Sequence, residues 1–218
     1  MDFYNWISNN YIEVFGAVAG ILYVILEVRQ NIWLWPVGII TSAVYIWVFL
    51  TGKLYADMGL QGYYLVISVM GWYWWLHKKR GGGGEGERAR LPSQEGLGVG
   101  YEGAEKLKVS HLKTKTGIIL GVIFLLLYFL MWFTLDRFTD SPVPAWDSFI
   151  TSLSIIATWM LARKIYEHWF LWIVVNIAAA LLFFTRGLYP TVILYIVYCA
   201  MSFVGLVAWK KTIKKQSL

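Results

Sequence analysis

Seven blocks of apolar residues, each about twenty residues long, dominate this sequence. A helix needs about that many residues to cross roughly 30 Å of hydrocarbon, whereas the blocks are too long for strands and lack period-two alternation. Only 15% of the 218 residues are charged and 58% are hydrophobic, which is unusual for a soluble domain. The sequence therefore predicts an all-α transmembrane protein with helices at 11–29, 32–51, 56–76, 116–136, 146–163, 168–186 and 190–209.

Basic residues gather at alternate ends of these predicted helices. With the N-terminus outside, sixteen Lys and Arg residues fall on the cytoplasmic side and three fall outside, namely Lys53, Arg137 and Arg186. Because basic flanks resist translocation, we expect the N-terminus outside and the C-terminus in the cytoplasm. The same placement accounts for the net charge of +6 without nucleic acid as a partner. No basic segment precedes the first block, so we expect it to stay in the mature protein rather than to be cleaved as a signal peptide.

The sequence changes character between the third and fourth predicted helices. Residues 78–115 are rich in Gly and in charged residues and lack apolar periodicity, which predicts a flexible cytoplasmic linker. The chain then divides into five segments, which are a three-helix unit over 1–77, the linker over 78–115, a linking transmembrane helix over 116–137, a second three-helix unit over 145–210 and a basic cytoplasmic tail over 211–218.

The two three-helix units share residues in the same order. A shift of 137 lays Leu34 and Trp35 over Leu171 and Trp172. A shift of 134 lays Tyr55, Tyr64, Ser68, Gly71 and Trp75 over Tyr189, Tyr198, Ser202, Gly205 and Trp209. Such a pattern predicts a duplication. Three helices reverse the direction of the chain and the single linking helix restores it, so we expect a seven-helix bundle with parallel repeats in a 3+1+3 order. Two halves arranged in this way can expose a central site to each side in turn.

The sixth predicted helix carries candidate ligand contacts. Trp169, Trp172 and Asn176 follow one another at i, i+3 and i+7, which places them on one helical face. An amide near the middle of the bilayer is costly unless it faces protein, water or ligand. We therefore expect Asn176 either to bind a ligand or to form a hydrogen bond between helices.

The third predicted helix carries a second polar and aromatic stripe. Its members recur at helical spacing and are Asp57, Gln61, Tyr64, Ser68 and either Trp72 or Trp75. This stripe can face Asn176. Trp72 is open to a second interpretation, an aromatic belt at the membrane interface, and the same holds for Trp35 at the start of the second helix.

Ionisable residues are placed away from the middle of the predicted helices. The acidic residues lie near span ends, in loops or in tails, and the three histidines, His77, His111 and His168, lie at span edges or in the linker. Ion-coupled carriers keep ionisable groups near their sites, so this placement favours passive transport without a metal or cofactor and supplies no catalytic constellation. A pocket of aromatic rings and amides without a buried acid suits a flat polar ligand or a delocalised cation.

Five ordered motifs run along the chain outside the linker. They are LYAxxxLQ (Leu54–Gln61), GWYxW (Gly71–Trp75), PAWDS (Pro144–Ser148), ARKxxExWxxWxxxN (Ala162–Asn176) and GLY (Gly187–Tyr189). In these motifs the chain resembles the PnuC family of vitamin transporters. The resemblance implies homotrimers of SWEET-like 3+1+3 subunits in the cell inner membrane, which import nicotinamide riboside by facilitated diffusion with intracellular phosphorylation as the trap. Trp172, Asn176 and Gln61 match the family's substrate-binding residues, and the expected site is completed by Tyr64, Ser68, Trp169, Trp72 and Trp35.

One position departs from the family pattern. Carriers that resemble nicotinamide riboside transporters often have Asn seven residues after the matching glutamine, and here that residue is Ser68. Similar proteins form a thiamine-type branch of the family, so thiamine, another cationic aromatic vitamin, is an alternative substrate. A membrane-embedded enzyme built around Asp147 and Ser148, or a structural membrane protein, ranks behind both.

Overall fold

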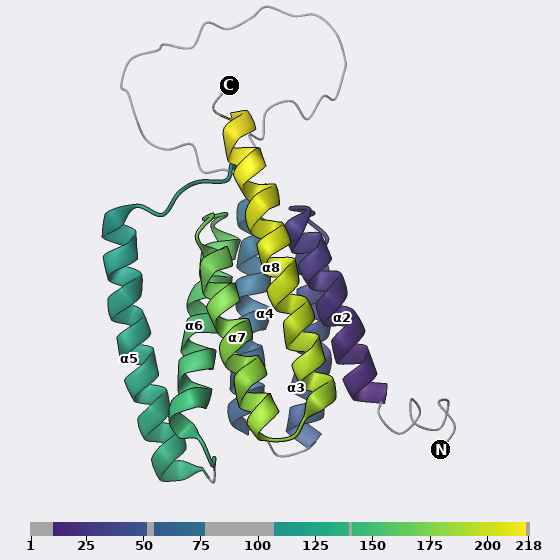
Figure 1. Ribbon diagram of the computed structural model, residues 1–218, viewed down its shortest axis with the longest axis vertical. Coiled ribbons are helices and arrows are strands. Elements are labelled where there is room, and N and C mark those ends of the chain that lie inside the picture. Colours follow the sequence, from purple (N-terminus) through teal and green to yellow (C-terminus); the bar gives the residue numbers. More distant parts are fainter. Residues whose placement is uncertain (1–10, 52–54, 77–106, 140, 217–218) are drawn as a thin grey trace, which may run out of the picture.

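The computed structural model describes residues 11–51, 55–76, 107–139 and 141–216. These residues form seven helices that stand side by side in one bundle (Figure 1). Their bounds are α2 Tyr11–Val28, α3 Leu34–Thr51, α4 Tyr55–Leu76, α5 Thr114–Phe138, α6 Pro144–Ala162, α7 His168–Thr185 and α8 Tyr189–Gln216. The prediction of seven helices is confirmed within the described part of the chain. The main difference is α8, which continues from its predicted end at 209 to Gln216 and so includes most of the predicted basic tail.

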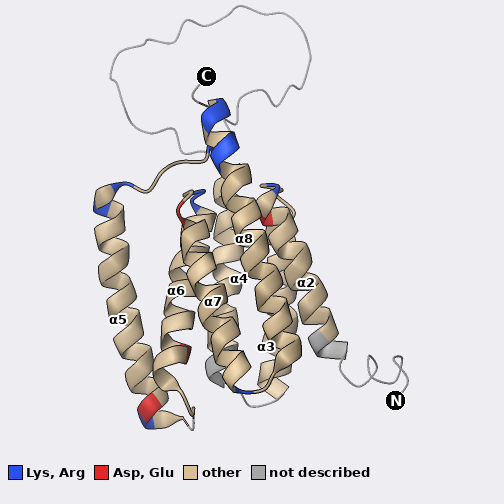
Figure 2. Cartoon of the chain, viewed as in Figure 1, with Lys and Arg blue, Asp and Glu red and all other residues tan. Residues whose placement is uncertain are grey.

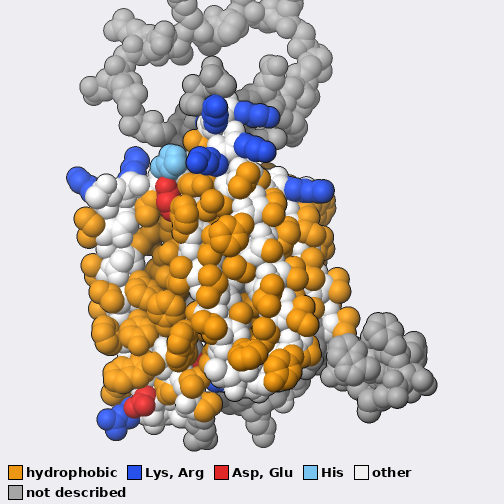
Figure 3. Space-filling model, viewed as in Figure 1, with side chains coloured by type: hydrophobic (Ala, Val, Ile, Leu, Met, Phe, Trp, Pro, Cys, Tyr) orange, Lys and Arg blue, Asp and Glu red, His pale blue; other side chains and the backbone are white. Residues whose placement is uncertain are grey.

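The outside of the bundle is apolar along most of its length. Five helices, α3, α5, α6, α7 and α8, are long and apolar enough to cross a membrane, and α2 adds a shorter apolar stretch over Val14–Val28. On α5 the side chains of Ile118, Leu126 and Phe133 are each more than half exposed, and Figure 3 shows hydrophobic side chains over the whole visible height of the bundle. So much exposed apolar surface is unfavourable in water and favourable in lipid. The protein is a multi-pass membrane protein.

The helices pack as two groups with α5 at one side. The helix α3 packs along α4, and α7 packs along α8; α2 contacts both α3 and α8, and α6 contacts both α4 and α7. Among the described helices α5 contacts only α6, and it stands at the edge of the bundle in Figure 1. The first and last three helices therefore face one another across a shared interior.

An offset of 134 residues relates the first three helices to the last three. The helices α3 and α7 both have 18 residues, and their first residues, Leu34 and His168, are 134 positions apart. The same offset links the ends of α2 and α6 at Val28 and Ala162, and the starts of α4 and α8 at Tyr55 and Tyr189. The two groups of helices thus correspond in order and in spacing along the chain.

Tryptophan packing follows the same offset. The Trp35 ring lies where a Cβ on Gly71 would be, and it makes an edge contact with Trp75 at 5.4 Å between ring centroids. In the other group the Trp169 ring lies in the same way against Gly205 and contacts Trp209 at 5.8 Å. The counterpart of Trp35 is therefore Trp169, 134 residues later. The shift of 137, which paired Trp35 with Trp172, is wrong by one helical turn.

The turns after α2 and α6 also correspond. Gln30 and Lys164 both have a φ of 51°, and they are the non-glycine residues with positive φ in the described chain. In each turn the backbone amide of the next residue donates to a carbonyl in the last turn of the helix. Asn31 donates to Leu26 and Ile165 donates to Met160, each with an N···O distance of 2.9 Å. This is the Schellman arrangement, which satisfies carbonyls at the end of a helix. Because a left-handed conformation is costly for residues other than glycine, its use at both positions indicates a shared backbone design.

Each of these turns also reaches the opposite group of helices. The side-chain amide of Gln30 donates to the hydroxyl of Thr212 on α8, 3.0 Å away. The ammonium of Lys164 lies 4.1 Å from the centre of the Trp75 ring on α4. The two groups are thus joined reciprocally at this end of the bundle.

Residues 107–113 form an ordered connection and not a free linker. Val109 is buried, and the backbone of Ser110 exchanges two hydrogen bonds with the α6–α7 turn, at Lys164 and Tyr166. The carboxylate of Glu167 accepts a hydrogen bond from the Leu112 amide at 2.8 Å. The predicted flexibility of 78–115 is therefore wrong for its last residues, because the backbone polar groups there are paired. Residues 78–106 of the predicted linker lie outside the described residues.

The two ends of the bundle differ in charge. Figure 2 shows most Lys and Arg side chains at the end where α8 finishes and α5 begins. In the described chain the residues at that end include Arg29, Lys115, Arg163 and the lysines of α8, whereas Arg137 and Arg186 lie at the other end. The predicted segregation of basic residues is thus present in the folded chain.

Candidate functional site

A cavity of about 260 Å³ lies inside the bundle. Every helix except α5 contributes to its wall, so the cavity lies between the two groups of helices. Its lining residues are Gly16, Ala19, Gly20, Tyr23, Val24, Glu27, Gly38, Thr41, Ser42, Gln61, Tyr64, Ser68, Thr158, Trp169, Trp172, Asn176, Tyr198 and Ser202. Aromatic rings, hydroxyls and amides on a mostly apolar wall are typical of a small-molecule site.

Six of the eight residues expected in the site line this cavity. They are Gln61, Tyr64, Ser68, Trp169, Trp172 and Asn176. The structure places Trp35 and Trp72 elsewhere. Trp35 is fully buried behind Gly71, where the packing of α3 on α4 encloses it, and Trp72 is 39% exposed on the outer surface of α4. Helical spacing alone could not separate the face of α4 that lines the cavity from the neighbouring face that meets lipid.

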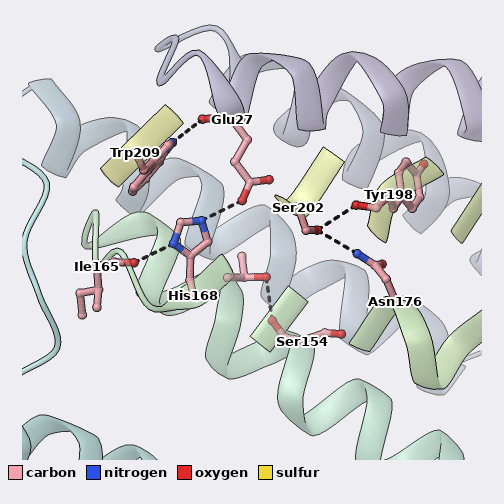
Figure 4. A network of polar contacts seen from close by, with 9 residues as sticks. Glu27, Ser154, Ile165, His168, Asn176, Tyr198, Ser202 and Trp209 are labelled. Atoms are coloured by element: carbon pink, nitrogen blue, oxygen red, sulfur yellow. Dashed lines mark hydrogen bonds and ion pairs between the residues drawn. The ribbon is translucent and has the colours of Figure 1, made fainter. Parts of the chain in front are cut away.

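Asn176 is held by a short chain of hydrogen bonds between α7 and α8. Its Nδ2 donates to the hydroxyl of Ser202 at 3.2 Å, and Ser202 donates in turn to the carbonyl of Tyr198 at 2.8 Å (Figure 4). Only one of the two amide hydrogens is used in this contact. The carboxamide therefore bridges two helices, as one of the two predictions had it, and it also borders the cavity.

Two indole groups on the cavity wall have unused donors. The Nε1 atoms of Trp169 and Trp172 are buried, and neither has a hydrogen-bond partner among the described residues. A buried donor without a partner is costly, so such atoms call for an explanation. The rings of both tryptophans line the cavity, but their Nε1 atoms have no exposed surface, so a bound molecule reaches these donors only if the side chains shift. Nothing in the structure explains the similar Nε1 atoms of Trp35 and Trp75, which lie outside the cavity.

The two groups of helices line the cavity unequally. At the offset of 134, Gly38 of α3 corresponds to Trp172 of α7, and Ser42 corresponds to Asn176. A Cβ on Gly38 would lie 2.9 Å from the Ser68 hydroxyl. At this level the first group packs Gly38 closely against Ser68, whereas the second presents an aromatic ring and an amide to the cavity. The stacking surface for a flat molecule at this level is therefore the Trp172 ring.

The face of α2 was not recognised from the sequence. Its residues Gly16, Gly20, Tyr23 and Glu27 line the cavity, at spacings of four, three and four residues. That helical spacing of small and polar residues was a usable signal. The glycines have a packing role, because the phenol of Tyr198 occupies the space that a side chain at Gly20 would need.

Glu27 also overturns the expectation that the pocket contains no buried acid. Its side chain is 4% exposed and lines the cavity, and its Oε1 lies 3.1 Å from Nε2 of His168, which is fully buried (Figure 4). Both residues stand near the ends of their helices, as predicted. The tight packing of α2 against α8 nevertheless removes Glu27 from water, and Trp209 of α8 donates its indole N–H to the Glu27 carbonyl at 3.1 Å. Position along a helix therefore did not reveal burial.

These features define a class of protein before any comparison is made. A multi-pass helical bundle that encloses a ligand-sized aromatic and polar cavity has the architecture of a small-molecule transporter. The family model of the nicotinamide mononucleotide transporter matches residues 10–211. The chain belongs to this family.

Individual relatives agree with this assignment. The chain is 25% identical over 208 residues to the nicotinamide riboside transporter PnuC of Escherichia coli (strain K12), covering 92% of this chain and 85% of that protein. It is 27% identical over 211 residues to the protein of the same name from Neisseria mucosa, covering 93% and 73%. It is 23% identical over 201 residues to the riboflavin/roseoflavin transporter RibM of Streptomyces davaonensis, covering 90% and 83%.

One solved structure has the same fold. A crystal structure of the vitamin B3 transporter PnuC superposes with a TM-score of 0.69, covering 97% of this chain and 86% of that chain at 23% sequence identity. The resemblance to the PnuC family that the motifs predicted is confirmed by this match together with the family model.

Proposed function

We propose that this protein imports nicotinamide riboside across the cell inner membrane by facilitated diffusion. The observation that carries the proposal is the cavity in which Gln61, Trp172 and Asn176 meet, in a chain whose relatives include nicotinamide riboside transporters. Facilitated diffusion needs a sink for the ligand, and intracellular phosphorylation of the riboside is the trap that fits this role. The protein acts without catalysis of its own.

The proposed contacts follow from the chemistry of the ligand. Nicotinamide riboside has a flat cationic ring, a carboxamide and a ribose. The Trp172 face stacks on the ring, while the free hydrogen of the Asn176 amide and the Gln61 amide bind the carboxamide. The Trp169 ring supplies further aromatic surface on the same wall. Tyr64 and Ser68 supply further hydroxyls on the opposite wall.

We propose in addition that the bundle is a 3+1+3 arrangement of parallel repeats that rock about the cavity. The constant offset of 134 residues between helix bounds, tryptophan contacts and turns supports this. The segregation of basic residues supports an N-terminus outside and a C-terminus in the cytoplasm. By analogy with the family, three such subunits form a homotrimer.

Thiamine is the second candidate substrate. Ser68 lines the cavity at the position where an asparagine was expected of a nicotinamide riboside carrier. A hydroxyl is shorter than a carboxamide and makes fewer hydrogen bonds, so this wall is less specific for an amide-bearing ligand. Thiamine is also cationic and aromatic, and it fits the same combination of rings and hydroxyls.

Equilibrium binding and transport test the proposal together. Purified protein is titrated calorimetrically with nicotinamide riboside, thiamine and riboflavin, and then reconstituted in liposomes for uptake. We expect saturable binding of nicotinamide riboside and uptake that stops at equal concentrations inside and outside. Binding of thiamine alone would make thiamine, and not nicotinamide riboside, the substrate. Binding of none of the three would overturn the vitamin proposal.

A further inference from the structure

The buried contact between Glu27 of α2 and His168 of α7, which we name the Glu27–His168 pair, has no polar counterpart in the other group of helices. The residues at the corresponding positions are Leu161, which is 134 residues after Glu27, and Leu34, which is 134 residues before His168. Both leucines are fully buried and belong to one hydrophobic cluster. In the other group of helices, apolar packing is therefore sufficient to hold the fold at this position. A carboxylate and an imidazole at the equivalent place indicate a task beyond packing, since burying them is costly.

The geometry of the pair limits the hydrogens that it shares to two or one. The Nδ1 atom of His168 lies 2.7 Å from the carbonyl oxygen of Ile165, and a carbonyl can only accept, so Nδ1 carries a hydrogen. The contact of 3.1 Å between Nε2 and the Glu27 carboxyl then needs one more hydrogen, on either the nitrogen or the oxygen. With that hydrogen the pair has no net charge. Without it the pair carries one negative charge on Glu27.

The carboxyl group faces the cavity as well as the histidine. Glu27 lines the cavity, whereas His168 lies behind it, with ring centroids 4.6 Å from Trp169 and 4.7 Å from Trp209. Figure 4 shows the second carboxyl oxygen of Glu27 directed away from His168, toward the side where Ser202 and Asn176 lie. A ligand in the cavity can therefore reach Glu27 without displacing the imidazole.

The surrounding helices supply no other charge within the cavity. The titratable groups that line it besides Glu27 are the phenols of Tyr23 on α2, Tyr64 on α4 and Tyr198 on α8, which are neutral near pH 7. The elements α3 and α6 contribute no titratable group to its wall. Of the charged residues next to His168, Lys164 lies over the Trp75 ring and Glu167 contacts His111 outside the cavity. Glu27 is the one charged residue among those that line this cavity in the described chain.

We propose that Glu27 recognises the positive charge of the ligand, and that a cationic heteroaromatic ligand displaces the proton held by the Glu27–His168 pair. This inference rests on the proposed function, because it takes the ligand to be a cationic vitamin. A cation entering beside the neutral pair would leave a charge uncompensated in a mostly apolar cavity. Release of the proton to solvent leaves the Glu27 carboxylate as the counter-ion. Uncharged riboflavin gains nothing from this exchange, so the pair selects cations from within the family's ligands.

Calorimetry of the wild-type protein tests the exchange. Nicotinamide riboside is titrated between pH 5 and 8 in buffers with different ionisation enthalpies, with its uncharged 1,4-dihydro form as the matched ligand. We expect release of about one proton per cation bound in the acidic part of this range, and affinity that rises up to about tenfold per pH unit there. The dihydro form is expected to bind without proton release. Cation binding without proton release at every pH would overturn the proposal.

Two variants test the residues themselves. Glu27→Gln keeps a hydrogen bond to Nε2 of His168 and removes the charge. The double variant Glu27→Leu/His168→Leu installs the leucines that the other group of helices carries at Leu161 and Leu34, so it is compatible with the fold. In both we expect at least about tenfold weaker cation binding and loss of the pH dependence, with binding of the dihydro form retained as the sign of an intact cavity.

The outcomes separate this inference from the proposed function. If the wild-type protein binds no cationic vitamin at any pH, the proposed function fails and the inference fails with it. If both variants bind the cation as tightly as the wild type, the role of Glu27 is overturned while the proposed function stands.

Discussion

Asn176 on α7 donates a hydrogen bond to Ser202 on α8, and Ser202 keeps a second bond to the carbonyl of Tyr198 that does not depend on the amide. Replacing Asn176 by Ala therefore leaves Ser202 with a partner and removes an amide from the cavity wall. We expect Asn176→Ala to weaken binding of nicotinamide riboside at least about tenfold, because a polar ligand group loses its partner, while the unfolding temperature changes little.

Asn31→Ala is the matched control for this amide. Asn31 is exposed in the α2–α3 turn, where its side chain accepts a hydrogen bond from the Trp33 amide, and it does not line the cavity. Calorimetric titration of both variants compares an amide inside the cavity with one outside it. Equal affinities of the two variants would show that Asn176 only joins helices.

The unused indole donor of Trp172 provides a second test. Trp172→Phe keeps an aromatic face and removes the N–H, which has no partner among the described residues. If the ligand accepts this hydrogen, we expect several-fold weaker binding, as for the loss of one hydrogen bond of about 0.5–1.5 kcal/mol. Trp35→Phe removes a similar buried donor outside the cavity and should leave the affinity unchanged. A Trp172→Phe variant that binds as tightly as Trp35→Phe would exclude this contact.

The close approach of tryptophan to glycine predicts matched losses of stability in the two groups of helices. A methyl group on Gly71 or Gly205 would overlap the Trp35 or Trp169 ring. We expect each Gly→Ala change to lower the free energy of unfolding by about 1–3 kcal/mol, the usual range for overpacking. Thermal unfolding in detergent, followed by circular dichroism, measures the effect.

Gly121→Ala on α5 is the control for these two variants. No atom lies within 4 Å of the position that its Cβ would take, so only the higher helix propensity of Ala acts there. We expect an unchanged or slightly higher unfolding temperature. A loss of stability in Gly205→Ala without one in Gly71→Ala would contradict the equivalence of the two groups of helices.

Much of the fold could be predicted from the sequence because the bilayer imposes a fixed length on each helix. The seven helices and the uneven distribution of basic residues follow from that constraint. The register of the repeat could not be predicted in the same way. Leu34 and Trp35 also match Leu171 and Trp172 in sequence, although that alignment is displaced by one helical turn from the one in the structure. The helix bounds, the two turns and the packing of Trp35 and Trp169 against their glycines decide between the two alignments.

The cavity wall was predicted on α4 and α7 and missed on the other four helices that line it, of which α2 contributes Glu27. Asn176 and Gln61 are conspicuous because amides are costly in hydrocarbon, whatever they contact. Glu27 was discounted because it is one residue from the end of α2, where an acid normally reaches water. Its burial depends on α8, whose Trp209 covers it from a position 182 residues away. The spacing of small and polar residues marks this face of α2, but it does not reveal burial that depends on a distant helix.

The contact between Glu167 and residues 111–112 predicts a local change when the carboxylate is removed. One oxygen of Glu167 contacts Nδ1 of His111 and the other accepts from the Leu112 amide, both at 2.8 Å. In Glu167→Ala the Leu112 amide loses its acceptor, so we expect faster hydrogen exchange there, measured by mass spectrometry of peptides covering 107–115.

Two further variants make this exchange experiment specific. Glu167→Gln keeps an oxygen that can accept from Leu112, so it should retain most of the protection. Asp136→Ala changes an acid at the far end of α5, which contacts Arg137 at 3.8 Å, and should leave peptides 107–115 unaffected. The Ser110 amide keeps its bond to the Lys164 carbonyl in all three variants and serves as the internal reference. If Glu167→Ala exchanges no faster than Glu167→Gln, other contacts hold the segment, and burial of Val109 is then the main anchor.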